Sequence, residues 1–404
     1  MTLIEPFRAL RPAPGRAAEI LAPPYDVLSS AEARERAKGK PWSFLHVSKA
    51  EIDLDPAIDL YDRAVYAKAA ENLRHMIAAG VLVRDAKPSY YVYRLTWRDR
   101  AQTGLAAIAA LADYATNRIR RHELTTPTKE DDRVRQIEAV NAQTGPVMIA
   151  YPDAPEIDAL LAHANTRSPQ VDATADDGVH HQLWVVDEPE AIGSFTRAFD
   201  RLPALYIADG HHRSAAAARV AKARNAASAQ QFLAVVFPHR QMTILDYNRL
   251  LKTLNGRSAG ALLDALRRTF AIVPAVEPVR PGASNEFGLF VSGSWHRLTL
   301  PPDQIPKDPI GRLPITLLSR HVIEPLFGIN DQRNDKRIDF VGGGRGLDEL
   351  ARRVTSGEAA AAFSLYPTQM DDLMAVADAG GIMPPKSTWF EPKLADGMVS
   401  HVLD

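Results

Sequence analysis

The sequence predicts an α/β fold of the mixed α+β type, in which helical and strand-like segments alternate along 404 residues. The composition is that of an ordinary globular protein, with 46% hydrophobic and 24% charged residues. Apolar residues recur at helical spacing between 56 and 79. The run from Tyr90 to Trp97 is rich in aromatic residues and is typical of a β-strand. A chain of this length usually forms roughly two to three domains.

The charge balance and the absence of cysteine exclude several classes of protein. Lysine and arginine total 48 against 49 aspartate and glutamate residues, which gives a formal net charge of −1. Without a global excess of positive charge, we expect no nucleic-acid partner. The chain has no cysteine, so disulfides, thiolate ligands and cysteine nucleophiles are excluded. Any catalytic mechanism must therefore use oxygen and nitrogen groups.

The N-terminal residues and the apolar segments indicate the cellular compartment in which we expect the protein. Glu5 and Pro6 stand where a signal peptide would carry a basic segment and then an apolar core, so we expect no export. A membrane-spanning helix needs about 18 or more consecutive apolar residues. Even the alanine-rich stretch from Leu105 to Ala112 is less than half that long. We therefore expect a cytoplasmic protein without a membrane span.

The first part of the chain is predicted to mix helices and strands. Helical patterns cover 31–38 and 56–79, and we expect these helices to cover a sheet. The strand at 90–97 is followed by a polar turn at 99–104, and 105–111 is its expected hairpin partner. The N-terminal region is therefore α+β.

Further elements follow a stretch rich in proline and aspartate at 151–155, which marks a domain boundary. We expect a helix at 156–164 and a strand at 182–186. Later in the chain we expect a helix at 259–270, and a hairpin formed by 288–291 and 296–300. These elements predict three segments: an N-terminal α+β region, a segment with the turn described next, and a C-terminal α+β region, at 1–152, 153–250 and 251–404.

The sharpest motif is Asp209-Gly210-His211-His212-Arg213, which follows a strand-like run and precedes an alanine-rich helical segment. Gly210 can adopt the backbone angles of a tight turn, and the N–H groups that begin the following helix form a site for an anion. His211 and His212 add side-chain donors, and Arg213 can bind a phosphate with two parallel hydrogen bonds. Asp209 is a carboxylate at the same point. The motif predicts a phosphate pocket.

Two other interpretations of this motif remain open. The loop can be a surface loop whose histidines are only solvated. The histidines can instead bind a metal ion, although His211 and His212 are adjacent and lack the spacing of a helical HExxH motif.

A second polar segment runs from Arg121 to Arg133. Helix entry is expected near Thr128, and capping by this run accounts for the acidic residues 130–132. Arg121, His122 and Glu123 precede the helix at the end of a predicted strand, and capping does not explain them. They are candidate site residues, with a solvated loop as the alternative. We expect them to lie beside 209–213 in the folded protein.

A third candidate lies near the C-terminus, in the stretch from Met383 to Lys393. Lys386 is followed by two hydroxyl residues, as in a P-loop, but the glycine spacing of a P-loop is missing. Lys386 is retained as a candidate phosphate ligand. The glycines at 342–344, which precede Arg345, are interpreted as a flexible turn.

Several of these motifs together resemble a bacterial and archaeal family known as domain of unknown function 1015. The motifs that carry the resemblance are spread over most of the chain: Ala22-Pro23-Pro24-Tyr25-Asp26-Val27, the segment from His122-Glu123 to Arg133, Gly145-Pro146-Val147, residues 209–213, Asn248-Arg249 and Pro384-Pro385-Lys386-Ser387-Thr388. The family name implies no activity.

The turn at 209–213 also resembles the phosphate-binding motif of the ParB and sulfiredoxin superfamily, which includes free serine kinases. This resemblance implies a ParB/sulfiredoxin-like core. Sulfiredoxin has its reactive cysteine where this chain has His211, so sulfiredoxin chemistry is excluded. No basic recognition helix for DNA is found, which leaves the serine kinase branch. The resemblance to the domain of unknown function 1015 family adds an association with phosphorylated serine biosynthesis genes. This association implies serine or phosphoserine as the small ligand.

These observations predict a phosphotransferase that acts on a small hydroxyl compound, with serine as substrate and ATP or ADP as the nucleotide. Glu123 is the candidate base, Asp209 is a candidate Mg²⁺ ligand or orients a histidine, and His211 completes the catalytic set. The predicted binding residues share the ability to hold phosphate or substrate, and they are Asp26, Arg121, His122, Arg133, Gly210, His212, Arg213 and Lys386. A phosphatase with the same pocket and a non-catalytic, nucleotide-responsive binding protein remain alternatives. The sequence leaves the oligomeric state open.

Overall fold

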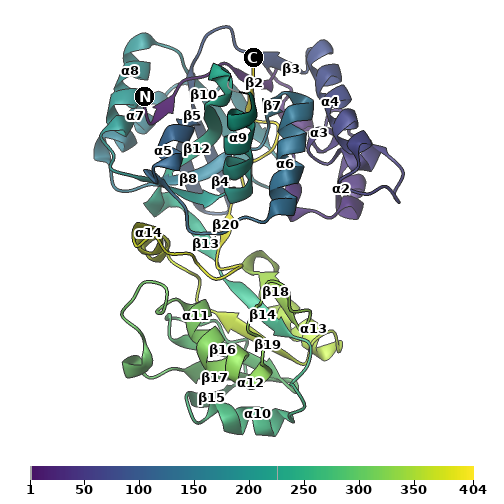
Figure 1. Ribbon diagram of the computed structural model, residues 1–404, viewed down its shortest axis with the longest axis vertical. Helices are drawn as coiled ribbons and strands as arrows, with labels where there is room; N and C mark the ends of the chain where they lie inside the picture. Colours follow the sequence, from purple (N-terminus) through teal and green to yellow (C-terminus); the bar gives the residue numbers. More distant parts are fainter. Residues whose placement is uncertain (1, 225) are drawn as a thin grey trace. The chain divides into compact units, whose positions relative to one another are not determined.

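The computed structural model describes residues 2–224 and 226–404. The chain forms two compact units, which we call the major and the minor unit (Figure 1). The major unit comprises Met1–Met242 and Pro392–Asp404, and the minor unit comprises Thr243–Glu391. Both contain helices and sheets, so the predicted mixed α/β fold is confirmed. Within the described ranges, no helix combines the length and the apolar character needed to cross a bilayer.

A large, mostly antiparallel sheet forms the centre of the major unit. In spatial order its strands are β6 (Ile119–Arg120), β11 (Leu205–Asp209), β8 (Val147–Tyr151), β12 (Gln231–Pro238), β5 (Arg100–Ala110), β4 (Tyr90–Trp97), β10 (His180–Val186) and β9 (Val171–Thr174), with β1 (Ile4–Glu5) paired to β5. Strands β4 and β5 form the expected hairpin, with Trp97 opposite Arg100. The expected polar turn at 99–104 is too long, because residues from Arg100 onward already pair with β4 and satisfy their backbone groups there.

Helices cover this sheet and flank it. They are α1 (Ala17–Ile20), α2 (Ser30–Ala37), α3 (Leu45–Ser48), α4 (Arg63–Ala78), α5 (Leu111–Ala115), α6 (Pro127–Val140), α7 (Pro155–Ala164), α8 (Pro189–Asp200) and α9 (His211–Arg224). The helix expected at 56–79 begins only at Arg63, because Asp62 caps it by accepting the N–H of Ala64 at 2.8 Å. Figure 1 shows α6 and α9 side by side in front of the sheet.

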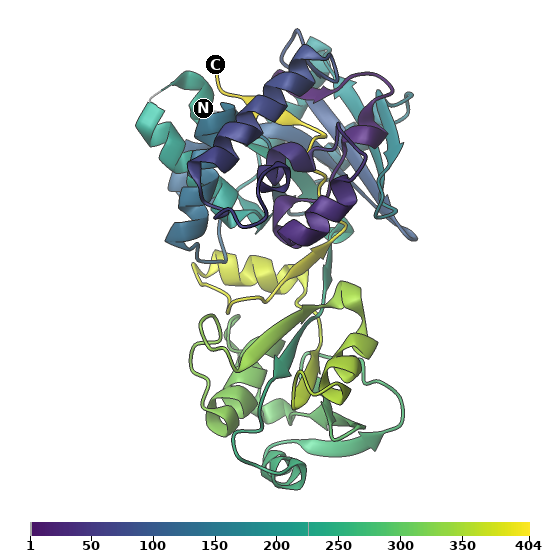
Figure 2. The same ribbon diagram turned by 90° about the vertical axis from the view of Figure 1, so that its right-hand side faces the viewer.

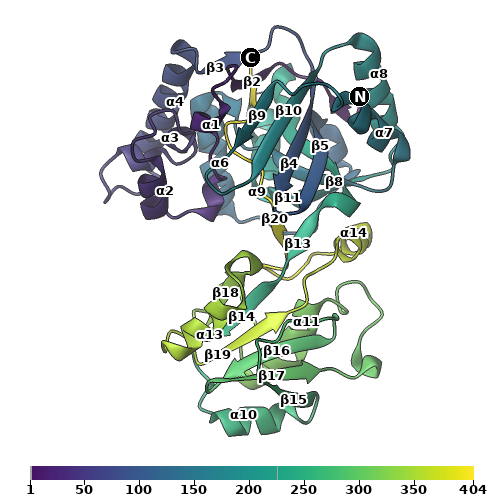
Figure 3. The ribbon, with the colours of Figure 1, turned by 180° about the vertical axis from the view of Figure 1, so that it is seen from behind.

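The main core lies between the sheet and helices α7, α8 and α9. Phe195 and Phe199 of α8, Leu161 of α7 and Ala217 of α9 pack against buried residues of the strands. Figure 3 shows β4, β5, β9 and β10 from the opposite side. The sheet therefore carries its apolar residues inward and provides a rigid base for the loops at its edge.

A second core lies under helices α2, α3 and α4, which appear in purple to blue in Figure 2. It includes Leu10, Leu45, Leu73 and Leu82. These helices pack on a four-stranded sheet of β3 (Leu82–Arg84), β2 (Ala9–Pro12), β21 (Ser400–Val402) and β7 (Ala142–Gln143). The last residues of the chain are thus built into the major unit.

The minor unit has its own sheet. In spatial order its strands are β15 (Ala271–Ala275), β17 (Ser294–Thr299), β16 (Glu286–Val291), β19 (Ala361–Leu365), β14 (Tyr247–Leu251) and β18 (Ile338–Gly342), and a separate pair is formed by β13 (Thr243–Leu245) and β20 (Trp389–Glu391). Its helices are α10 (Ala259–Leu266), α11 (Pro314–Leu318), α12 (Glu324–Phe327), α13 (Leu347–Thr355) and α14 (Met370–Asp378). Strands β16 and β17 form the expected hairpin.

The three expected segments do not coincide with the two units. No boundary can lie at 152/153, because β8 on one side of it pairs with β11 and β12 on the other. The expected boundary at 250/251 falls inside β14, which pairs with β18 and β19. Long-range strand pairing, which the local sequence does not display, decides both points.

Candidate functional site

Two loops of the major unit meet at one edge of the central sheet. Strands β6 and β11 are parallel neighbours, with Arg120 opposite Tyr206. Because parallel strands end at the same edge, the residues that follow them are brought together. The segment 121–123 accordingly lies beside the turn at 209–213, as expected.

The turn has the strand, turn and helix order that its sequence predicts. β11 ends at Asp209 and α9 begins at His211. Gly210 has a φ of +102°, a backbone conformation that a side chain would strain. A Cβ atom there would also lie 3.0 Å from Nε of Arg213. The backbone conformation and the close approach of Arg213 both require glycine at this position.

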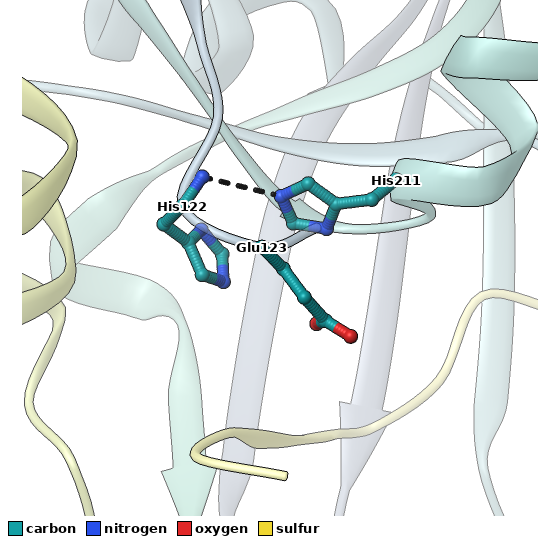
Figure 4. A group of neighbouring side chains, drawn as sticks. All are labelled: His122, Glu123 and His211. Carbon is teal, nitrogen blue, oxygen red and sulfur yellow. Dashed lines mark hydrogen bonds between the residues drawn. The ribbon is translucent and has the colours of Figure 1, made fainter. Parts of the chain in front are cut away.

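Three side chains lie at the centre of the site, and we call them the His-Glu-His cluster: His122, Glu123 and His211 (Figure 4). One nitrogen or oxygen atom from each of them lies within 4.8 Å of those from the other two. The imidazole rings meet edge to face with centroids 4.5 Å apart. The backbone N–H of His122 donates to Nε2 of His211 at 3.5 Å, the dashed line in Figure 4. Both histidines are buried and Glu123 is partly exposed, so the carboxylate is the member of the cluster nearest to solvent.

Burial makes both histidines neutral. Burial lowers the pKa of His122 to about 4. The nearby backbone of Ile207 raises this pKa and offsets part of the shift, although it makes no hydrogen bond to the ring. Burial also lowers the pKa of His211 well below its usual value, with a smaller contribution in the same direction from His122. At neutral pH these rings can donate or accept hydrogen bonds but contribute no positive charge. Arg121, the third residue of the segment, is exposed, with its guanidinium 4.8 Å from the ring centroid of Tyr114.

Asp209 lies between two cations. Arg213 donates to its Oδ2 atom at 3.0 Å, and Nζ of Lys393 lies 3.8 Å from the same oxygen. Burial opposes the ionisation of Asp209, but Lys393 and then Arg213 more than offset it, so its pKa lies below the usual value. Arg213 is only 8% exposed and also donates to the carbonyl of Pro146. Much of the donor capacity that the sequence suggested for phosphate is therefore used within the protein.

Three other predicted residues line a cavity of about 250 Å³ beside the turn: Asp26, Arg133 and His212. The guanidinium of Arg133 lies 3.8 Å from the ring centroid of Tyr25 and pairs with Asp132 at 2.6 Å. Nε2 of His212 accepts the backbone N–H of Thr126 at 3.1 Å. The predicted site residues of the major unit thus form two groups, one around the His-Glu-His cluster and one around this cavity.

A small internal cavity of about 30 Å³ is lined by Tyr25, Arg133, Gly145, Arg213 and Asp396, among others. A Cβ atom on Gly145 would lie 3.2 Å from Cδ of Arg213 and 3.7 Å from Oδ1 of Asp396, so glycine keeps this contact close. Burial raises the pKa of Asp396 to about 7, although the charge of Arg213 acts in the opposite direction.

Glu130 lies in the first turn of α6, as expected of an acidic residue in this run. The N-cap of α6 is Thr126, whose side chain makes no capping bond to any described residue. Glu130 and Asp131 also pair with Arg219 of α9 at 3.3 and 2.7 Å. These pairs join the two helices that follow the two loops of the site.

The remaining candidates belong to the minor unit. Lys386 is exposed, has a φ of 57° and places Nζ 5.8 Å from the ring centroid of Tyr247. The glycine turn after β18 is a short 3-10 helix, Gly343–Arg345. A Cβ atom on Gly343 would lie 2.2 Å from Oδ1 of Asp246, so this turn is packed against its neighbour.

Sequence reasoning missed two residues of the site, Lys393 and Asp396. Lys393 belongs to the C-terminal polar stretch, but the P-loop-like pattern in that stretch favours Lys386. No local pattern shows which of the two lysines lies at the site, because this depends on where the chain returns to the major unit. Asp396 had no motif to mark it.

One comparison with known proteins shows the protein family to which the chain belongs. The model of the family described as "Protein of unknown function (DUF1015)" matches residues 4–316. No curated protein matches the sequence. Among solved structures, a free serine kinase in complex with AMP is 12% identical, with 68% of this chain and 84% of that chain covered and a TM-score of 0.34.

Two further structures have similar values. A conserved hypothetical protein from Pyrococcus furiosus is 12% identical, with 70% of this chain and 91% of that chain covered and a TM-score of 0.34. SbnI with a C-terminal truncation, from Staphylococcus aureus, is 12% identical, with 73% and 86% covered and a TM-score of 0.36. TM-scores this low carry no argument about the chain. The family match confirms the resemblance carried by the motifs, and the chain belongs to the family of proteins of unknown function DUF1015.

Proposed function

We propose that this protein is a nucleotide-dependent phosphotransferase that acts on a small hydroxyl compound, with serine as the substrate and ATP or ADP as the phosphoryl donor. One observation carries the proposal: a partly exposed carboxylate, Glu123, lies within reach of the turn at 209–213 at the edge of the sheet. A phosphate-binding turn alone only binds, whereas transfer also needs a base near the attacking oxygen.

In the proposed reaction Glu123 accepts the proton of the substrate hydroxyl. The hydroxyl oxygen then forms a bond to the terminal phosphorus, and the bond from that phosphorus to the bridging oxygen of the nucleotide breaks. His122 and His211 are neutral, so each can donate one ring N–H to the phosphoryl oxygens. Positive charge for those oxygens comes from Lys393 and Arg121 and from the N-terminus of α9.

Asp209 does not fit the Mg²⁺ role considered for it. Arg213 and Lys393 lie 3.0 and 3.8 Å from its Oδ2 atom, and a third cation at this oxygen would be repelled by both. Asp209 instead anchors the two cations beside the turn. No step of the proposed reaction depends on a metal ion.

The 250 Å³ cavity supports a small polar acceptor. Its lining combines carboxylates, such as Asp26 and Glu51, with cations, such as Lys129 and Arg133. A compound with both an ammonium and a carboxylate group would find partners of both signs there. His212 belongs to the cavity and to the turn, so an acceptor bound here lies next to the phosphate-binding loop.

The test is an assay of the purified full-length chain by mass spectrometry. Serine is supplied with ATP and, separately, with ADP, and phosphoserine is supplied alone. We expect phosphoserine and the shortened nucleotide to form in equal amounts. Release of phosphate from phosphoserine without nucleotide would replace the proposal with a phosphatase, and nucleotide binding without turnover would replace it with a nucleotide-responsive binding protein.

A further inference from the structure

We propose that His122, Glu123 and His211 form a binding site for one divalent transition-metal ion, such as Zn²⁺ or Co²⁺. The inference uses the same residues as the proposed function but does not depend on phosphoryl transfer. It follows from the geometry of the cluster and from the surroundings of His122.

His122 is the strongest indication of a missing partner. Its side chain is 1% exposed, and both ring nitrogens lack a hydrogen-bond partner among residues 2–224 and 226–404. Buried polar atoms are nearly always paired, and each exception calls for an explanation such as an ion. A metal ion bound to one of these nitrogens would supply that partner.

The distances are compatible with a single ion. The three ligand atoms lie within 4.8 Å of one another. Ligand atoms about 2.0–2.1 Å from a tetrahedral Zn²⁺ ion lie about 3.4 Å apart. Binding of one ion therefore requires the ligand atoms to approach one another by up to about 1.4 Å. In Figure 4 the three side chains extend into a common region between the two loops.

The donor set selects the class of metal. Two imidazoles and one carboxylate are typical of Zn²⁺ catalytic sites and of other first-row divalent ions, whereas Mg²⁺ prefers oxygen ligands and water. Three protein ligands leave at least one coordination position for water or another small ligand. We therefore expect Zn²⁺ and Co²⁺ to bind and Mg²⁺ not to bind at this cluster.

A hydrogen bond between the two histidines competes with metal binding. Nε2 of His211 accepts the backbone N–H of His122 at 3.5 Å, the long limit of a hydrogen bond. Ligation through Nδ1 of His211 moves the ring proton to Nε2 and gives up this bond. At His211 this weak hydrogen bond is lost and a metal–nitrogen bond is gained.

Occupancy of the site has a consequence for the proposed reaction. A metal ion held by Glu123 removes this carboxylate from proton transfer. Zn²⁺ is therefore expected to inhibit phosphoryl transfer. Inhibition is a secondary readout, and direct binding decides the inference.

The experiment uses the full-length chain, freed of metal with a chelator and measured without nucleotide or serine. Co²⁺ is titrated and followed by its visible absorption, and Zn²⁺ is titrated by calorimetry. We expect one ion per chain. We expect His122→Asn to weaken binding at least tenfold, and the neighbouring His212→Asn, as the matched control, to leave it unchanged. X-ray absorption of the Zn²⁺-loaded wild-type chain needs no variant and should show a nitrogen and oxygen shell with two imidazoles.

The outcomes separate this inference from the proposed function. Absence of Co²⁺ and Zn²⁺ binding, a shell without two imidazoles, or equal effects of His122→Asn and His212→Asn would overturn the metal site. Metal binding in a chain that transfers no phosphoryl group would support the metal site and overturn the proposed function. Phosphoryl transfer by a chain that binds neither ion would support the proposed function and overturn the metal site.

Discussion

A strand-turn-helix loop with glycine and arginine occurs in each unit, and the two loops have different surroundings in the described structure. In the major unit, β11 leads through Gly210 to α9. In the minor unit, β18 leads through the glycine turn at 342–346 to α13. The first turn is surrounded by buried histidines and an ion-paired carboxylate. The second is filled by neighbouring residues, with the Cβ position of Gly343 overlapping the side chain of Asp246.

The difference arises from the neighbouring strand. β11 has a parallel neighbour, β6, which ends at the same edge and delivers His122 and Glu123 to the turn. β18 lies at the edge of its sheet and, within the described chain, pairs only with the antiparallel β14. An antiparallel neighbour brings the start of its strand to the turn, and here that is Asp246, whose carbonyl accepts the N–H of Gly343 at 2.7 Å. Polar side chains gather at the first turn because a second loop meets it there.

The largest expected effect concerns Asp396, beside the first turn. Its pKa is raised to about 7, chiefly by burial and further by the charge of Asp26, while Arg213 and Arg133 act in the opposite direction. The folded state therefore holds this proton more tightly than the unfolded state. The stabilisation is complete below the unfolded pKa near 3.8 and is lost as the pH rises through about 7. Since one pKa unit is about 1.4 kcal/mol, the loss amounts to roughly 4 kcal/mol.

Hydrogen exchange of α9 between pH 4 and 8, corrected for the intrinsic exchange rate, measures this loss. A regional readout is needed because the chain has two units and a single unfolding free energy is not defined. Asp396→Asn should flatten the decline in α9 and leave α13 unchanged. Parallel profiles for wild type and variant would show that Asp396 ionises normally.

The next effect concerns the ion pair of the first turn, in which Arg213 is buried and Asp209 is partly exposed. Arg213→Ala leaves Asp209 without its closest cation and should lower the local unfolding free energy of α9 by roughly 3 kcal/mol. Arg345→Ala in the glycine turn is the matched control, because Arg345 is exposed. It should change the unfolding free energy of α13 by less than about 0.5 kcal/mol. Similar losses for both arginines, by hydrogen exchange, would mean that the two turns are held in the same way.

Catalysis should depend on the two loops that meet in the major unit and not on the glycine turn at 342–346. If Glu123 is the base, Glu123→Gln should lower the turnover of serine phosphorylation about 100-fold or more. Arg345→Ala should leave turnover unchanged. A Glu123→Gln variant with near-normal turnover would show that the proton is removed by another group.

The smallest expected effect concerns the filled turn. Gly343→Ala places a Cβ atom 2.2 Å from Asp246 and should destabilise the minor unit by roughly 2 kcal/mol through overpacking. Co²⁺ binding by the His-Glu-His cluster should remain as in the wild type. Hydrogen exchange of β14 and β18 measures the first effect and visible absorption measures the second. A change in Co²⁺ affinity would show that the glycine turn of the minor unit affects the His-Glu-His cluster, contrary to the expectation that the two turns are independent.

The sequence by itself determined the local features. The requirement for glycine at 210, the hairpins of β4 with β5 and of β16 with β17, and the mixed α/β composition all follow from neighbouring residues. Each depends on backbone angles or on pairing across a short turn, which short-range patterns encode. The family resemblance likewise came from motifs that can be read along the chain.

Only the tertiary structure decided which residues share the site. Arg213 pairs with Asp209 because the close approach at Gly210 places its guanidinium there. Lys393 reaches the same carboxylate while Lys386 belongs to the minor unit, because the chain returns to the major unit at Pro392. The physical reason is that sheet register and chain return join residues far apart in sequence, and no local pattern specifies which of two similar lysines is brought to the site.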